Sequence, residues 1–158
     1  MKKLFQSMMP LTAVFGLIIC AQLSVSGQDG KRDLSSIEGV WKTVVTPRIC
    51  ATGTPVGSTF PGILMFNDGG TMTGTSTAVS SVYGSWARES GLRRYSFATL
   101  SFRYDTSGNL IGTRRIFQDV TLDDDGDSFV SSGGFQDRDN AGQLTMSGCS
   151  TATGERFE

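Results

Sequence analysis

The chain contains no histidine among its 158 residues. Catalytic triads with an imidazole base, cysteine–histidine pairs and histidine-ligated zinc or haem are therefore excluded. An excess of positive charge is also missing, because 14 basic residues face 15 acidic ones, and a nucleic-acid-binding protein needs a basic face. Only 18% of the residues are charged and 38% are hydrophobic, which is typical of a globular domain and not of a disordered chain. The length fits one domain.

The N-terminus carries the pattern of a secretory signal. Lys2 and Lys3 precede a mainly apolar stretch over residues 11–23. Small residues over 24–27 then provide a cleavage site before Gln28. The sequence therefore predicts export to a periplasm or beyond the cell, with residues 1–27 as the signal peptide.

Two alternatives to cleavage stay open. A retained membrane anchor is disfavoured because a spanning helix needs roughly 18–20 apolar residues. Lipidation at Cys20 is disfavoured because Ile19, which precedes it, is not small. After cleavage we expect a flexible segment over residues 28–36, a folded domain over 37–158, and no stable membrane span.

Cleavage would leave two of the three cysteines, Cys50 and Cys149. An even number of cysteines in an exported chain predicts a disulfide. The alternative, a reactive thiol pair or a metal site, lacks further soft ligands. We therefore expect a structural disulfide that ties the first third of the domain to its last strand.

Runs rich in β-forming residues, each closed by a turn signal, follow one another along the domain. Turn signals such as residues 67–70 and 105–109 separate them. Short connections make neighbouring strands antiparallel, and eight such strands close into an up-and-down barrel without free edges. A barrel of this size is either filled or holds one small ligand. The predicted strands cover residues 40–46, 63–66, 71–77, 83–89, 94–104, 110–122, 128–136 and 144–153, with Pro47 ending the first.

A Gly-x-Trp sequence, Gly39-Val40-Trp41, stands at the head of the first predicted strand, and Arg156 lies near the end of the last. The domain thereby resembles the lipocalins and the wider calycin group, above all short bacterial lipocalin-like barrels, with some likeness to the allene-oxide-cyclase-type barrel. The resemblance implies that Trp41 closes one end of the barrel and that Arg156 packs across its indole. It also implies that the long loop after the first strand covers the mouth, with Phe60 as a lid or as part of a disulfide-anchored surface loop. The Thr-Asp-Tyr motif of larger lipocalins is absent, so ligand specificity is not carried over.

Arginine and aromatic residues of the central strands are the candidate ligand-binding residues. If Arg103 and Arg115 point into the barrel, they could hold a carboxylate or a phosphate, whereas on the outer face they would pair with neighbouring acids. Trp86, Phe97 and Phe117 would line an apolar pocket or simply fill the core. The same two alternatives hold for three other aromatic residues, Tyr83, Phe102 and Phe129.

We interpret the acidic run over residues 123–127 as a hairpin turn. Calcium is the alternative, but the spacing is not that of an EF-hand and the distal glutamate is missing. No nucleophile has a base beside it, and Asp119 with Tyr95, or Glu89 with Arg88, are the acid–base pairs available. We therefore expect no metal and no cofactor, and a binding protein more than an enzyme.

The function that the sequence favours is binding of a small apolar, amphipathic or anionic molecule inside an exported barrel. An isomerase or cyclase that uses the barrel as a dry chamber is one alternative, and it requires a buried ionisable residue facing an apolar pocket. A protein-binding or inhibitor barrel is the other, and it requires a filled core and an exposed apolar loop surface.

Overall fold

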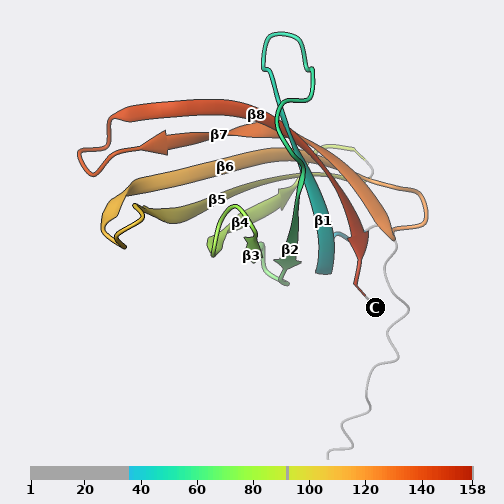
Figure 1. The fold of residues 1–158 in the computed structure, drawn as a ribbon. Helices are drawn as coiled ribbons and strands as arrows, with labels where there is room; N and C mark the ends of the chain where they lie inside the picture. Colours follow the sequence, from blue (N-terminus) through green and yellow to red (C-terminus); the bar gives the residue numbers. More distant parts are fainter. Residues whose placement is uncertain (1–35, 92, 158) are drawn as a thin grey trace, which may run out of the picture. The chain divides into compact units, whose positions relative to one another are not determined.

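Eight antiparallel strands in chain order make up the fold. The structure is a computed structural model that describes residues 36–91 and 93–157. Each strand pairs with its neighbours in sequence and β8 pairs back with β1, which closes the barrel (Figure 1). The predicted all-β up-and-down architecture is therefore confirmed. The strands are β1 Gly39–Arg48, β2 Phe60–Phe66, β3 Thr71–Ser76, β4 Val82–Arg88, β5 Arg94–Tyr104, β6 Leu110–Leu122, β7 Ser128–Arg138 and β8 Leu144–Arg156.

The predicted signal over residues 1–27, with Cys20, and the predicted flexible segment up to residue 35 lie outside the described residues. Within the described ranges, no helix is long and apolar enough to cross a membrane. The predicted disulfide is present, and the Cα atoms of Cys50 and Cys149 lie 5.1 Å apart across a sequence separation of 99. It joins the loop after β1 to the middle of β8.

The tight turns form at the runs of glycine, asparagine and aspartate from which they were predicted. Gly69 and Gly70 adopt φ angles of 81° and 82°, which favour glycine, and the N–H of Asn67 donates to the carbonyl of Thr71 at 2.9 Å. Such short connections hold successive strands side by side, and this brings residues from all eight strands around one interior.

The first strand does not end before Pro47, which corrects the prediction. Pro47 lies inside β1 and pairs with Ser150 of β8, whereas the pairing of β1 with β2 ends at Val45 and Phe60. The carbonyl of Pro47 accepts a hydrogen bond from Val56, so the side of the residue that lacks an N–H faces the loop and not β8. Proline is tolerated at such an edge-like position.

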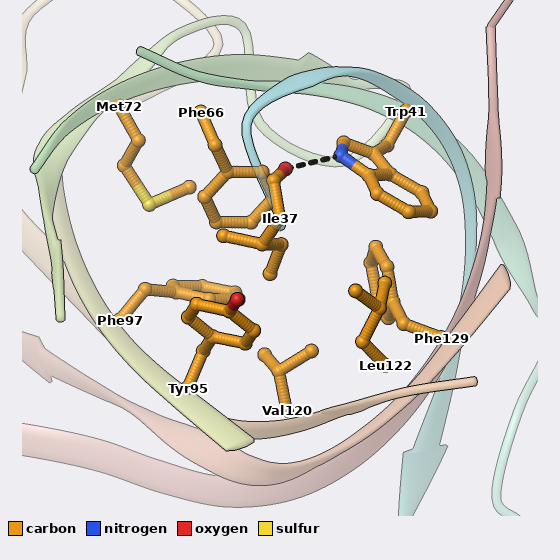
Figure 2. Packing of buried hydrophobic residues seen from close by; sticks show 9 residues of the cluster. All are labelled: Ile37, Trp41, Phe66, Met72, Tyr95, Phe97, Val120, Leu122 and Phe129. Carbon is orange, nitrogen blue, oxygen red and sulfur yellow. Dashed lines mark hydrogen bonds between the residues drawn. The ribbon is translucent and has the colours of Figure 1, made fainter. Parts of the chain in front are cut away.

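An apolar core fills one end of the barrel. Ile37 enters this end ahead of β1 and lies in the middle of a ring of side chains (Figure 2). The indole Nε1 of Trp41 donates to the carbonyl of Ile37 at 2.8 Å, so the entering segment is tied to the wall. The buried core consists of Ile37, Trp41, Phe66, Met72, Tyr95, Phe97, Val120, Leu122 and Phe129.

Arg156 holds the same end of the barrel together, and it pairs with Trp41 in the register of β1 and β8. Its guanidinium carbon lies 4.2 Å from the ring centroid of Trp41, which is the packing that the lipocalin resemblance implies. Its side chain also donates to the carbonyls of Ser36 at 2.8 Å, Glu38 at 2.6 Å and Gly126 at 2.9 Å. The strands β5–β8 have 11 to 13 residues and extend past the shorter β2–β4 at the opposite end (Figure 1).

Candidate functional site

Next to the apolar core the barrel contains a cavity of about 310 Å³. All eight strands contribute to its lining, and most of the side chains are apolar. Cavities of a few hundred Å³ with apolar walls are typical of small-molecule sites. The apolar part of the lining includes Val45, Leu64, Val82, Ile116 and Phe129.

Three polar atoms of the cavity lining are buried without a hydrogen-bond partner in the part of the chain that the structure describes: Thr99 Oγ1, Gln118 Oε1 and Ser131 Oγ. These residues are 3%, 6% and 6% exposed. The amide of Gln118 is held in place, because its Nε2 donates to Ser150 Oγ at 2.9 Å. Buried polar atoms are nearly always hydrogen-bonded, so these three atoms are available to hydrogen-bond a molecule inside the cavity, water included.

A charged cluster lies where the cavity approaches the extended ends of β5–β8. Asp137 is fully buried, and its carboxylate accepts two hydrogen bonds from Arg114, at 2.7 Å from Nε and 2.8 Å from Nη2. Nε of Arg103 lies 3.2 Å from the same carboxylate. The guanidinium of Arg114 also lies 4.5 Å from the ring centroid of Phe135. Charge-assisted bidentate contacts of this kind fix a guanidinium firmly.

The two candidate arginines, Arg103 and Arg115, lie on opposite faces of the barrel sheet. Arg103 points inward and joins the charged cluster, but Arg115 and Phe117 lie on the outer face of β6. The arginine that lines the cavity is Arg114. Register explains this, because Arg114 pairs with the buried Ser101 and alternate residues of a strand face the same side. Phe97 lines the cavity as expected.

The other aromatic candidates also lie partly inside the barrel and partly on its outer face. Phe129 lines the cavity, whereas Tyr83 and Phe102 are exposed on the outer face. Trp86 packs against the core at the closed end and is absent from the cavity lining, and its Nε1 donates to the carbonyl of Asn67 at 2.9 Å. Trp86 therefore supports the wall beside the cavity.

A second depression, of about 360 Å³, lies on the outer face of β4–β7 and is bordered by Ser85, Ala98, Arg115 and Phe117. It is open to solvent, so a bound molecule would keep much of its surface in water. Burial of apolar surface is the main source of affinity for a small molecule. The interior cavity is therefore the better candidate site.

The long loop after β1 is a disulfide-anchored surface loop, the alternative to a lid. Residues 49–59 are all exposed, and the loop projects away from the barrel (Figure 1). Phe60, at the start of β2, is half-buried and lines the cavity. Ala78 and Val79, from the connection between β3 and β4, also line it. That connection is compact, since Ser76 Oγ accepts hydrogen bonds from both of their N–H groups.

Of the candidate acid–base pairs, Asp119 and Tyr95 lie on opposite faces of the sheet. Tyr95 is buried inside the barrel, whereas Asp119 is exposed on the outer face. Glu89 accepts a hydrogen bond from Ser96 Oγ at the surface. Neither arrangement places a proton-transfer group beside the cavity.

The acidic run over residues 123–127 forms a turn, as predicted. The carboxylate of Asp123 accepts from the N–H of Asp124 at 2.7 Å and from Ser128 Oγ at 3.1 Å. These two bonds, the first larger in effect, lower the pKa of Asp123. No group of three or more metal-ligating side chains occurs among the described residues.

Sequence reasoning missed Asp137, which was expected to lie in a turn after β7. Two inward-facing arginines on adjacent strands were the available signal, because such charges are buried only with a partner.

A scan against protein-family models, a search of curated proteins and a search of solved structures find no match to this chain. The candidate site therefore rests on the residues of this chain alone.

Proposed function

We propose that the protein binds one small apolar or amphipathic molecule inside the barrel. The observation that carries this proposal is a cavity of about 310 Å³ with apolar walls and buried polar atoms that lack partners among the described residues. Burial of the ligand's apolar surface contributes about 25 cal/mol per Å² before the costs of binding. The polar atoms fix the orientation of the ligand.

The cavity volume limits the size of the ligand. At about 30 Å³ for each water-sized group, the cavity accommodates about ten non-hydrogen atoms. A binding free energy of about 0.3–0.6 kcal/mol per atom then corresponds to dissociation constants from millimolar to tens of micromolar. An eight-carbon chain with a polar end has the right size.

We also propose that the protein is exported and lipocalin-like. A disulfide between Cys50 and Cys149 supports an oxidising compartment. The closed eight-stranded barrel and the stacking of Arg156 on Trp41 support the likeness to lipocalins. The intact mass of the protein purified from its exporting host tests export: it should begin at Gln28 with the disulfide formed. A mass that retains the first residues, or a lipid adduct, would contradict cleavage.

The two alternatives are not favoured by the structure. A filled-core inhibitor barrel requires a barrel without a lumen, and this barrel has a cavity. A barrel enzyme requires a proton-transfer group facing the pocket, but the charged residue in the lining is Arg114, whose guanidinium is paired with Asp137.

Calorimetric titration with octanol tests the proposal. We expect saturable binding to the wild type and its loss in Ala152→Leu, because Ala152 lines the cavity and leucine would fill it. Thr153→Leu is the matched control, since Thr153 is the next residue on β8 and is exposed. Binding that is absent from the wild type, or that is unaffected by Ala152→Leu, would contradict the proposal.

A further inference from the structure

We propose that the polar end of the ligand is an anion of the carboxylate class, bound where the cavity meets Arg114, whose partner Asp137 is also contacted by Arg103. This inference rests on the proposed function and names the class of ligand for the same cavity. It is carried by the charge, the free donors and the rigidity of the cluster around Asp137.

The cluster has an excess of positive charge. Two guanidinium groups, Arg103 and Arg114, share the single carboxylate of Asp137. Arg114 is the charged member of the cavity lining, and the other lining residues are neutral. An anion at this end of the cavity would balance the second guanidinium, whereas a cation would be repelled.

The two guanidinium groups keep donors that Asp137 does not use. Arg114 binds Asp137 through Nε and Nη2, which leaves Nη1, and Arg103 approaches it through Nε, which leaves both of its terminal nitrogens. None of these three nitrogens donates a hydrogen bond to another of the described residues. Guanidinium groups only donate, so their ligand partner must accept several hydrogen bonds, as a carboxylate does.

Besides the unused guanidinium nitrogens, hydroxyl groups of β5 without a partner among the described residues offer further hydrogen-bond donors. Ser101 is 4% exposed and lies opposite Arg114 in the register of β5 and β6. Its Oγ, like Oγ1 of Thr99, has no hydrogen-bond partner within the described ranges. A carboxylate between Arg114 and β5 would accept from these hydroxyls and from the guanidinium groups together.

The cluster is held rigidly before any ligand binds. Phe135 stacks on the guanidinium of Arg114 and lies over Gly148, where a Cβ would come within 2.5 Å of its ring. Glycine at this position therefore lets Phe135 support the arginine. A site fixed in this way loses little conformational entropy on binding. The apolar chain of the ligand would extend from Arg114 toward Ile116 and Val82.

Three ligands of equal length test the inference on the wild type by calorimetric titration: octanoate, octanol and octylamine. We expect octanoate to bind about tenfold more tightly than octanol, and octylamine more weakly than both. This comparison needs no variant. Equal affinities for octanoate and octanol would overturn the anion assignment and leave the proposed function intact, whereas no binding of any of the three would overturn both.

Arg103→Gln is the variant that tests the role of the cluster. It removes the second positive charge and leaves the bidentate pair of Arg114 and Asp137, so we expect folding to be retained. Octanoate affinity should fall about tenfold, while octanol affinity should stay within about twofold. Arg115→Gln is the matched control, because Arg115 is an outward-facing arginine on β6. Equal losses in both variants, or no loss in Arg103→Gln, would overturn the inference.

Discussion

Replacing Thr99 with valine should leave the free energy of unfolding unchanged or raise it, while it weakens ligand binding. The hydroxyl of Thr99 is buried and has no hydrogen-bond partner in the described part of the chain. Valine has nearly the same shape, so the substitution leaves no new cavity. A buried hydroxyl without a partner costs about 1–3 kcal/mol. Water in the cavity would reduce this cost, so we expect a gain of about 0–2 kcal/mol.

The matched control is Thr151→Val. Oγ1 of Thr151 accepts a hydrogen bond from Nε of Arg48 at 2.7 Å. Valine at this position would remove that acceptor, so the free energy of unfolding should fall by about 1 kcal/mol. The two threonine-to-valine substitutions therefore have opposite expected signs, although the chemical change is the same.

Urea unfolding of the oxidised protein measures both free energies, and thermal unfolding supplies a second readout, with about 4 °C for each kcal/mol. Octanoate titration of Thr99→Val should show affinity reduced about fivefold. A loss of stability greater than about 1 kcal/mol in Thr99→Val would refute the reasoning, because it would show that the hydroxyl has a partner in the native protein.

Three further outcomes are expected. Arg156→Ala removes the stacking on the buried indole of Trp41 and the hydrogen bonds to carbonyls at the closed end. Urea unfolding should therefore show that the free energy of unfolding falls by about 3 kcal/mol. A fall below about 1 kcal/mol would contradict the role of this residue. Serine at both Cys50 and Cys149 should lower the free energy of unfolding by at most about 4.7 kcal/mol, the value for a loop of about 100 residues, and reduction of the wild type should give the same loss. The side-chain amide of Asn109, followed by its backbone N–H, holds the pKa of Asp105 below the usual 3.8. The contribution of Asp105 to stability is therefore complete above pH 3.8 and is lost as the pH falls through the lower folded-state pKa. An NMR titration of this carboxyl group should show that pKa rising toward 3.8 in Asn109→Ala, and an unchanged pKa would contradict the cause.

The strands could be predicted where glycine, asparagine and aspartate separate them. The bounds of β5, Arg94–Tyr104, and of β6, Leu110–Leu122, agree with the sequence prediction because the turn between them is marked on both sides. The prediction was wrong where a turn-forming residue lies inside a strand. Pro47 pairs with β8, and Asp137 belongs to β7 as the buried partner of two arginines.

The face of each residue on β6 could not be predicted. Both faces of this strand mix apolar and polar residues, and the register of β5 and β6 shifts between Arg103 and Tyr104. Such an irregularity moves the alternation by one residue, so counting from the turn does not show which side a residue faces. Arg114 and Arg115 are neighbours in sequence, and only the pairing of Arg114 with Ser101 shows which one lines the cavity.

An NMR titration of the isotope-labelled protein with octanoate tests the central claim most directly, because it locates the ligand. The account predicts intermolecular NOEs from the ligand chain to the methyl groups of Val82 and Ile116, which line the cavity. Amide shift changes should occur at Thr99 and Ser131 in the same titration. Contacts confined to the outer face around Phe117, or no contacts at saturating octanoate, would contradict the claim that the barrel interior is the binding site.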